Sequence, residues 1–95
     1  MAGYVIVDLQ VTDAEVYAEF REQVAGTVEA HGGRYLVRGG SAETIEGDWA
    51  PERLIVMEFE SVAQIKTWLA SPEFTELREI RHRSATANVI VVEGV

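Results

Sequence analysis

The first segment of the chain alternates between apolar and mixed positions. Residues 4–11, with the sequence YVIVDLQV, are rich in β-branched side chains, and every second residue is aliphatic. Because successive side chains point to opposite faces of a β-strand, this pattern predicts a strand with one apolar and one mixed face. The apolar face comprises Val5, Val7, Leu9 and Val11, and the mixed face comprises Tyr4, Ile6, Asp8 and Gln10. Such a strand is typical of a sheet that carries helices on one side only.

A helical period follows this strand. The apolar residues that recur at every fourth position, and so predict one buried helix face, are Val16, Phe20, Val24 and Val28. We expect the helix to begin at Thr12, which with Glu15 fits a capping box, and to run to about Ala30. Gly32 and Gly33 then end it, because glycine readily adopts the left-handed conformation that closes a helix.

The remaining pattern predicts three more strands and a second helical stretch. Strands are expected at 34–38, 53–60 and 88–95, with a polar loop at 41–52. The second helix begins at Ser61, in a capping box with Gln64, and restarts at Ser71-Pro72. The order βαββαβ indicates a single α+β domain over residues 1–95, of the ferredoxin-like type. Right-handed crossovers give a four-stranded antiparallel sheet of order 4-1-3-2 with its helices on one face.

The other face of this sheet is left uncovered by the chain itself. It is expected to carry the mixed face of the first strand together with Leu54, Val56, Glu58 and Glu60. From the last strand it carries either Val89, Val91 and Glu93 or Ile90 and Val92. Exposed aliphatic surface of this extent usually marks an interface, so we expect a homodimer formed through the open face.

Charge and cysteine content narrow the range of partners. The chain has 16 acidic and 8 basic residues, a formal net charge of −8 and no cysteine. Phosphate backbones and anionic lipids repel such a chain, so we expect neither nucleic acid nor membrane as a partner. The first eleven residues lack the basic segment of a signal peptide, and the absence of cysteine is compatible with a reducing compartment, so we expect a cytoplasmic protein.

Four segments of the chain carry a family resemblance, and together they extend over nearly its whole length: YVIVDLQVTDAEVYAEF, AHGGRYLVRGG, EGDWAPERLIVMEF and SPEF. They resemble the family known as domain of unknown function 1330. That family belongs to the dimeric α/β-barrel superfamily and is similar in fold to antibiotic-biosynthesis-type monooxygenases, stress-responsive barrel proteins and muconolactone isomerases. The resemblance implies a homodimer in which two sheets form a barrel, and it implies no particular reaction.

Asp8 and Glu58 are the candidate catalytic carboxylates. Each interrupts an otherwise apolar strand, and the predicted strand order makes the two strands neighbours. A carboxyl group in an apolar lumen has a raised pKa and can act as a general base near neutral pH. The alternative is structural: each carboxylate neutralises an arginine such as Arg34 or Arg53.

His31 is a third candidate catalytic residue. It lies at the predicted end of the first helix, where either its ring or its positive charge can stabilise the free carbonyl groups. The functional alternative is an acid–base group at the mouth of the barrel. The structural interpretation is favoured, because a histidine at a helix C-terminus is expected on electrostatic grounds alone.

Arg34 and Arg38 are candidate ligand-binding residues. With strict alternation they share one face of their strand with Leu36, and we place that face on the open side of the sheet. There they can form structural ion pairs with Asp8 or Glu58, or clamp the anionic group of a ligand.

Tyr4 and Trp49 are expected to line one ligand pocket on the open face, together with the candidate carboxylates and arginines. The loop residues Glu43, Glu46 and Asp48 lack the pattern of a calcium site, and we expect them to be solvated and to hold no metal. No phosphate-binding or nucleophile motif is present, so no tightly bound cofactor is expected. Two functions follow as hypotheses: a homodimeric barrel that binds or transforms a small organic, carboxylate-bearing molecule, or a structural or regulatory dimer without catalysis.

Overall fold

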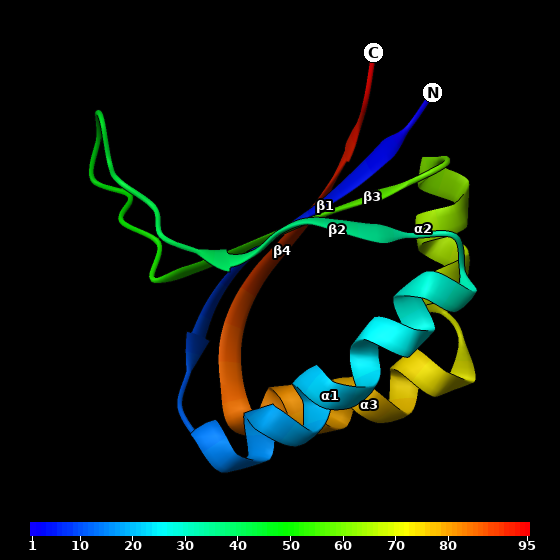
Figure 1. Ribbon diagram of the computed structural model, residues 1–95, viewed down its shortest axis with the longest axis horizontal. Coiled ribbons are helices and arrows are strands. Elements are labelled where there is room, and N and C mark those ends of the chain that lie inside the picture. The colour runs from blue at the N-terminus through cyan, green and yellow to red at the C-terminus, as the bar shows by residue number, and fades with distance from the viewer.

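The computed structural model describes all residues, 1–95, and has the predicted topology (Figure 1). Its elements are β1 (Gly3–Val11), α1 (Ala14–Ala30), β2 (Arg34–Gly40), β3 (Arg53–Phe59), α2 (Val62–Leu69), α3 (Pro72–Ser84) and β4 (Ala85–Glu93). The four strands form one antiparallel sheet of order β2-β3-β1-β4, which is the expected order counted from the other edge. The three helices cover one face, so the ferredoxin-like prediction is confirmed. No helix combines the length and the apolar character that a membrane crossing requires.

The core lies between the sheet and the helices, and its strand residues are those that the alternation predicts. Val5 pairs with Met57 and both are buried, so the same faces of β1 and β3 point toward the helices. Helix α1 contributes Tyr17, Phe20, Val24 and Val28 to the core. The core of α2 and α3 includes Ile65, Trp68, Phe74 and Leu77. Each such large side chain contributes about 1.5–3 kcal/mol when it leaves water, so these residues account for most of the stability of the layer.

Helix α1 begins one residue later than expected. Asp13, and not Thr12, is the N-cap, and its carboxylate accepts a hydrogen bond of 3.2 Å from the backbone amide of Val16. The backbone amide of Thr12 donates instead to the carbonyl oxygen of Ser84 at 2.8 Å, which ties the end of β1 to the end of α3. The capping box with Glu15 is therefore wrong, because the amide that Glu15 would reach already has a partner.

The second helical stretch is divided where Ser71-Pro72 predicts. Ser71 caps α3, and Pro72 occupies its first turn. Ser61 caps α2 by accepting a hydrogen bond from the amide of Gln64 at 3.1 Å. The side chain of Gln64 does not complete the capping box but donates to the carbonyl oxygen of His31 at 2.9 Å. This bond joins the start of α2 to the end of α1.

The two glycines after α1 have different roles. Gly32 has φ +78°, the left-handed conformation expected of the residue that follows a helix end. Gly33 instead makes a close approach, since a Cβ atom there would lie 2.6 Å from the ring of Phe59. The chain turns from α1 into β2 directly over this buried ring, and only a residue without a side chain fits.

Strand β2 contains irregularities that the alternation does not anticipate. Tyr35 pairs with Met57, but Val37 pairs with the next partner, Val56, so Leu36 is an extra residue in a bulge. Beyond the bulge the faces are exchanged, and Arg38 pairs with Ile55, which points toward the helices. The prediction that Arg34, Leu36 and Arg38 share one face is therefore wrong.

Strand β4 starts directly after α3, three residues before the predicted range, and ends at Glu93. Ile6 pairs with Ile90 and Tyr4 with Val92, so the alternative that places Ile90 and Val92 on the open face is confirmed. The first and last segments of the chain run side by side (Figure 1), and the amide of Gly94 donates to the carbonyl oxygen of Ala2 at 2.8 Å.

Residues 41–52 connect β2 to β3 without forming a helix or strand. We call this segment the arm. It extends from the end of the sheet and away from the helices (Figure 1). Every arm residue up to Ala50 is exposed, as is Glu52.

Candidate functional site

A narrow cavity lies between the sheet and the helices. It holds about 40 Å³ of free space and opens to solvent on one side, and 13 of its 16 lining residues are hydrophobic. Its walls come from the helix-facing positions of β1 and β3 and from the inner sides of the helices, among them Leu9, Phe20, Met57 and Trp68. Because these positions face away from water, the same alternation that builds the core also makes the cavity apolar.

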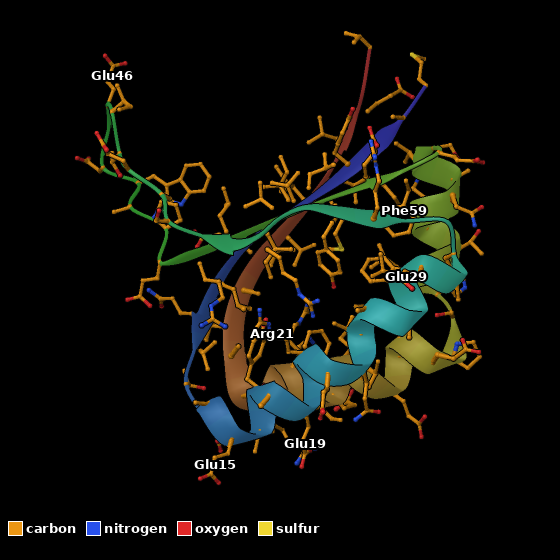
Figure 2. The ribbon with its side chains drawn as sticks, viewed as in Figure 1. Glu15, Glu19, Arg21, Glu29, Glu46 and Phe59 are labelled. Atoms are coloured by element: carbon orange, nitrogen blue, oxygen red, sulfur yellow. The ribbon has the colours of Figure 1, made fainter.

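The mouth of the cavity is lined by arginines. Arg21 of α1 and Arg38 of β2 line both the cavity and an adjoining hollow of about 230 Å³, to which β3 contributes Arg53. Arg81 of α3 lines the cavity itself. Figure 2 shows Arg21 in the space between α1 and the sheet, whereas Glu15 and Glu19 of the same helix lie on its outer side. Three arginines from three elements therefore line the apolar cavity, and a fourth, Arg53, lines only the more polar hollow beside it.

Neutral groups hold two of these arginines, Arg38 and Arg53, in place. The guanidinium of Arg38 donates to the carbonyl oxygen of Arg21 at 2.7 Å and lies 4.4 Å from the ring centre of Tyr35. The guanidinium of Arg53 lies 5.4 Å from the ring centre of Tyr17. Carbonyl and ring contacts orient a cation without cancelling its charge. The bulge at Leu36 is what turns Arg38 toward this side of the sheet.

No carboxylate forms a salt bridge with this cluster, although Glu22 borders an outer hollow with Arg21 and Arg38. The protein has 16 acidic residues, yet none of them lines the cavity or its mouth. The only salt bridge in the structure joins Arg34 to Glu58, on the other face of the sheet. Burial, and then the nearby charge of Arg78, lower the pKa of Arg81. The cluster therefore concentrates positive charge in an acidic protein, and its geometry can hold a negatively charged group.

The hydroxyl group of Tyr35 stays protonated at neutral pH. Burial raises its pKa above the ordinary value of 10.0, and the charge of Arg38 opposes this increase. Tyr35 packs against the core from the same strand face as Arg38. It can therefore donate a hydrogen bond to an anion beside Arg38 but cannot itself supply a base at that pH.

Glu58 and Arg34 meet on the open face, together with Tyr4. Arg34 Nε donates to Glu58 Oε1 at 2.8 Å, and the Tyr4 hydroxyl donates to Glu58 Oε2 at 3.1 Å. The hydrogen bond from Arg34, and then that from Tyr4, lower the pKa of Glu58. The hydrogen bond to Glu58 raises the pKa of Tyr4. The expectation of a raised pKa for Glu58 is wrong in this chain, because both of its oxygens accept hydrogen bonds.

Asp8 lies on the same face but apart from this cluster. Tyr4 is the β1 residue that pairs with Glu58, whereas Asp8 pairs with Leu54. A separation of four residues along a strand is about 13 Å, so the two candidate carboxylates do not meet within one chain. The carboxylate of Asp8 accepts a hydrogen bond of 2.7 Å from the indole nitrogen of Trp49. Tyr4 and Trp49 therefore lie at opposite ends of the face and do not wall one pocket.

His31 has the structural position that was favoured for it. It is the C-cap of α1, and its Nδ1 lies 2.8 Å from the carbonyl oxygen of Thr27. It lines neither the cavity nor the mouth. The structure contains no group of three or more His, Cys, Asp or Glu side chains arranged to hold a metal ion.

The arginine cluster is the feature that the sequence interpretation missed. Arg21 follows Tyr17 by four residues, so it continues the buried stripe of the helix, and this was the one signal that could have found it. Nothing in the sequence places Arg53 and Arg81 beside it, because they reach the site from β3 and α3 only after folding.

Solved structures similar to this one share its fold. A protein of unknown function from Rhodopseudomonas palustris has a TM-score of 0.81 and 17% identity, over 99% of this chain and 82% of that chain. SnoaB, a cofactor-independent oxygenase from Streptomyces nogalater, has a TM-score of 0.65 and 11% identity, over 99% and 92% of the two chains. A dimeric protein of unknown function with a ferredoxin-like fold from Bacteroides fragilis has a TM-score of 0.58 and 12% identity, over 98% and 96%.

At identities this low, the structural similarity establishes a common fold, and the activity of one protein does not carry over to another. No curated protein matches the chain significantly. The family comparison covers almost the whole sequence, since residues 2–95 match the family described as Domain of unknown function (DUF1330). The βαββαβ chain with its helix-covered cavity therefore belongs to the DUF1330 family.

Proposed function

We propose that the protein binds a small, mostly apolar molecule with one negatively charged group, in the cavity between the sheet and the helices. The observation that carries this proposal is that Arg21, Arg38 and Arg81 line an apolar cavity and Arg53 lines the hollow beside it, without a carboxylate among the lining residues. Partly buried charges that lack a partner are costly, and an anionic ligand removes that cost. The cavity holds only about 40 Å³, so it favours the slender apolar end of a ligand whose remainder lies in the adjoining hollow of about 230 Å³.

The geometry also gives the ligand an orientation. Its apolar part lies inward, against side chains such as Leu9, Met57 and Trp68. Its anionic group lies at the mouth, near Arg21 and Arg38, where each charge-assisted hydrogen bond contributes about 1.5–3 kcal/mol. A carboxylate is the expected group, since its two oxygens match the paired donors of a guanidinium.

The protein is proposed to act as a homodimer through its open sheet face. Ile90 is 55% exposed and Val92 40% exposed on that face, an unusual position for aliphatic side chains in a chain that acts alone. The similar protein from Bacteroides fragilis is described as dimeric, which supports this proposal. The cluster of Arg34, Glu58 and Tyr4 then serves as a structural ion pair within the dimer.

Chemical conversion of the ligand is proposed to need no tightly bound cofactor. SnoaB, which shares the fold, is described as a cofactor-independent oxygenase, and this supports the idea that such a scaffold can carry out chemistry alone. The catalytic roles of Asp8 and Glu58 remain predictions. The alternative is a dimer without catalysis, favoured on the open face by the closed hydrogen-bonding arrangement around Glu58.

Trp68 provides a direct test, because it lines the cavity and is one of only two tryptophans. In a Trp49→Phe background, fluorescence reports on Trp68 alone. We expect octanoate to change this fluorescence saturably and to bind at least about 10-fold more tightly than 1-octanol, since one ionic contact is worth about 1.4 kcal/mol or more. Octanol differs from octanoate only in its head group, so it isolates the contribution of the charge.

Arg38→Met is expected to remove most of the preference for octanoate. Arg83→Met is the matched control, because Arg83 is exposed on α3 and lines no part of the site. Equal affinity for acid and alcohol would refute the anion site. Fluorescence that neither compound changes would refute the cavity as a binding site.

A further inference from the structure

The hollow beside the cavity carries more positive charge than one carboxylate balances. Its lining residues are three arginines, Arg21, Arg38 and Arg53, together with Tyr17, Gly39 and Ile55. The only salt bridge of the chain lies on the other face of the sheet. Glu22 borders an outer hollow with Arg21 and Arg38, but Arg53 does not line that hollow. A ligand with a single carboxylate, bound at Arg38, therefore leaves Arg53 without a counter-charge.

Arg38 and Arg53 occupy separate positions in the site. Arg38 pairs with Ile55, and Arg53 lies two residues further along β3, on the same helix-facing side. Diagonal neighbours of this kind lie roughly 7–8 Å apart in a sheet. Each guanidinium then rests on its own ring, Arg38 at 4.4 Å from the centre of Tyr35 and Arg53 at 5.4 Å from the centre of Tyr17. The two cations therefore form two subsites.

The Arg53 subsite has donors and space for a ligand. A guanidinium has five N–H donors, and contact with the face of a ring orients the group while those donors stay available. Arg38, by contrast, already donates from Nη2 to the carbonyl oxygen of Arg21. Gly39 lines the hollow beside Arg53, and a Cβ atom there would lie 3.4 Å from Cγ and 3.8 Å from Nε of that arginine. The absence of a side chain at this position keeps the approach to Arg53 open.

The two subsites follow one another along the path of a bound ligand. Arg38 lines both the apolar cavity and the hollow, whereas Arg53 lines the hollow alone. We infer that the ligand is a dicarboxylic acid with an apolar chain, whose first carboxylate binds to Arg38 and Arg21 and whose second binds to Arg53. The inference rests on the proposed function and adds to it a second charge, with Arg53 as the residue that determines this specificity.

Two separate carboxylates fit this arrangement better than one compact group with two charges. A phosphate monoester concentrates its charge on a single phosphorus centre, whereas the cations here are held on two different aromatic rings. Non-specific attraction does not produce a preference for a dianion either. The chain has a formal net charge of −8, so at long range it repels a dianion more strongly than a monoanion. Tighter binding of the dianion must therefore come from local contacts.

Hexylsuccinate and its half-amide provide the direct comparison. The half-amide has nearly the same shape but one carboxylate fewer, so the difference in affinity reports on the second charge. Binding is followed through Trp68 fluorescence in the Trp49→Phe background, at constant ionic strength and about pH 8, where both carboxylates are ionised. We expect hexylsuccinate to bind at least about 10-fold more tightly, which corresponds to one charge-assisted contact.

Arg53→Met separates a role in specificity from a role in the fold. We expect this variant to bind hexylsuccinate at least about 10-fold more weakly than the parent, and octanoate within about 2-fold of it, since a monocarboxylate uses Arg38. Methionine keeps the apolar stem beside Tyr17, and circular dichroism checks the fold. Arg83→Met is again the matched control, and we expect it to change neither affinity.

The outcomes distinguish this inference from the proposed function. Equal affinities for hexylsuccinate and its half-amide, in a protein that still prefers octanoate to 1-octanol, would overturn the second subsite and leave the anion site intact. Octyl phosphate that binds more tightly than hexylsuccinate would overturn the two-subsite arrangement in favour of one compact anion. No preference for octanoate over 1-octanol would overturn both proposals. These three comparisons use the parent protein, so they hold whether or not Arg53→Met folds.

Discussion

Gly33 provides a sharp test of the packing between α1, β2 and β3. In a Gly33→Ala variant the new Cβ atom would lie 2.6 Å from two ring carbons of Phe59 and 2.8 Å from Cγ1 of Val28. Neither neighbour can move into solvent, because Phe59 is 1% exposed and Val28 is fully buried. The backbone of Gly33 has no positive φ, so the cost is steric and does not come from the backbone conformation.

The magnitude follows from the cost of overpacking a core, which is about 1–3 kcal/mol. We expect Gly33→Ala to lower the free energy of unfolding by about 2 kcal/mol. For a chain of this size that corresponds to a decrease in Tm of about 8–16 °C. The assay is thermal and urea unfolding followed by circular dichroism, with all variants at the same concentration, because dimerisation makes Tm depend on concentration.

Gly26→Ala is the matched control for this substitution. Gly26 lies within α1, and a Cβ atom there would meet no atom within 4 Å. Since alanine is the better helix former, we expect the variant to gain about 0.5–1 kcal/mol. Equal stability of Gly33→Ala and wild type, or equal losses in the two variants, would refute the claim that the approach to Phe59 requires glycine.

Other predictions concern the helix cap and the open face. Because Asp13 is the N-cap, Asp13→Ala should lower the free energy of unfolding in urea by about 1 kcal/mol, and Thr12→Ala by less than about 0.5 kcal/mol. A larger loss for Thr12→Ala than for Asp13→Ala would show that Thr12 caps the helix after all. Arg34→Met should destabilise the protein at pH 7 by a margin that shrinks as the pH falls below 4.5. The pKa of Glu58 is lowered in the folded state, so its stabilising contribution is present above the unfolded pKa and is lost as the pH falls through the folded one. A margin that is constant between pH 7 and pH 3 would contradict this. Tyr4→Phe removes the second donor to Glu58, so the loss of stability that it causes should also shrink over the same pH range.

The buried and open faces of the central strands could be predicted, because side chains alternate between the two faces and only one of the two alternating sets is fully apolar. Val5 and Met57 are both buried on the expected side, and Gly32 has the expected left-handed conformation. Cap positions were less certain, since Thr12 and Asp13 are both good N-caps. The competing partner of the Thr12 amide is Ser84, which is distant in sequence.

The position of Arg38 could not be predicted from the sequence. The sequence predicts an anionic ligand bound by Arg38 on the open face; the ligand stays a prediction, and the structure turns Arg38 toward the helices instead. The bulge at Leu36 reverses the direction of Arg38, and no glycine or proline at that position announces it. The companions of Arg38 come from three other elements, so their convergence is a property of tertiary structure alone.

The pairing of the first strand with the last has a consequence for how the protein is made. During synthesis on the ribosome, β1 emerges first, but its two neighbours in the sheet, β3 and β4, are made much later. Until residues 85–93 are available, the edge of β1 that β4 will occupy stays open and can pair with another nascent chain. Before β4 is made, charged groups already lie beside β1: those of Asp8, Arg53 and the acidic arm. The sheet can close only after β4 has left the ribosome, so β1 cannot gain its second neighbour while residues 1–84 alone are available.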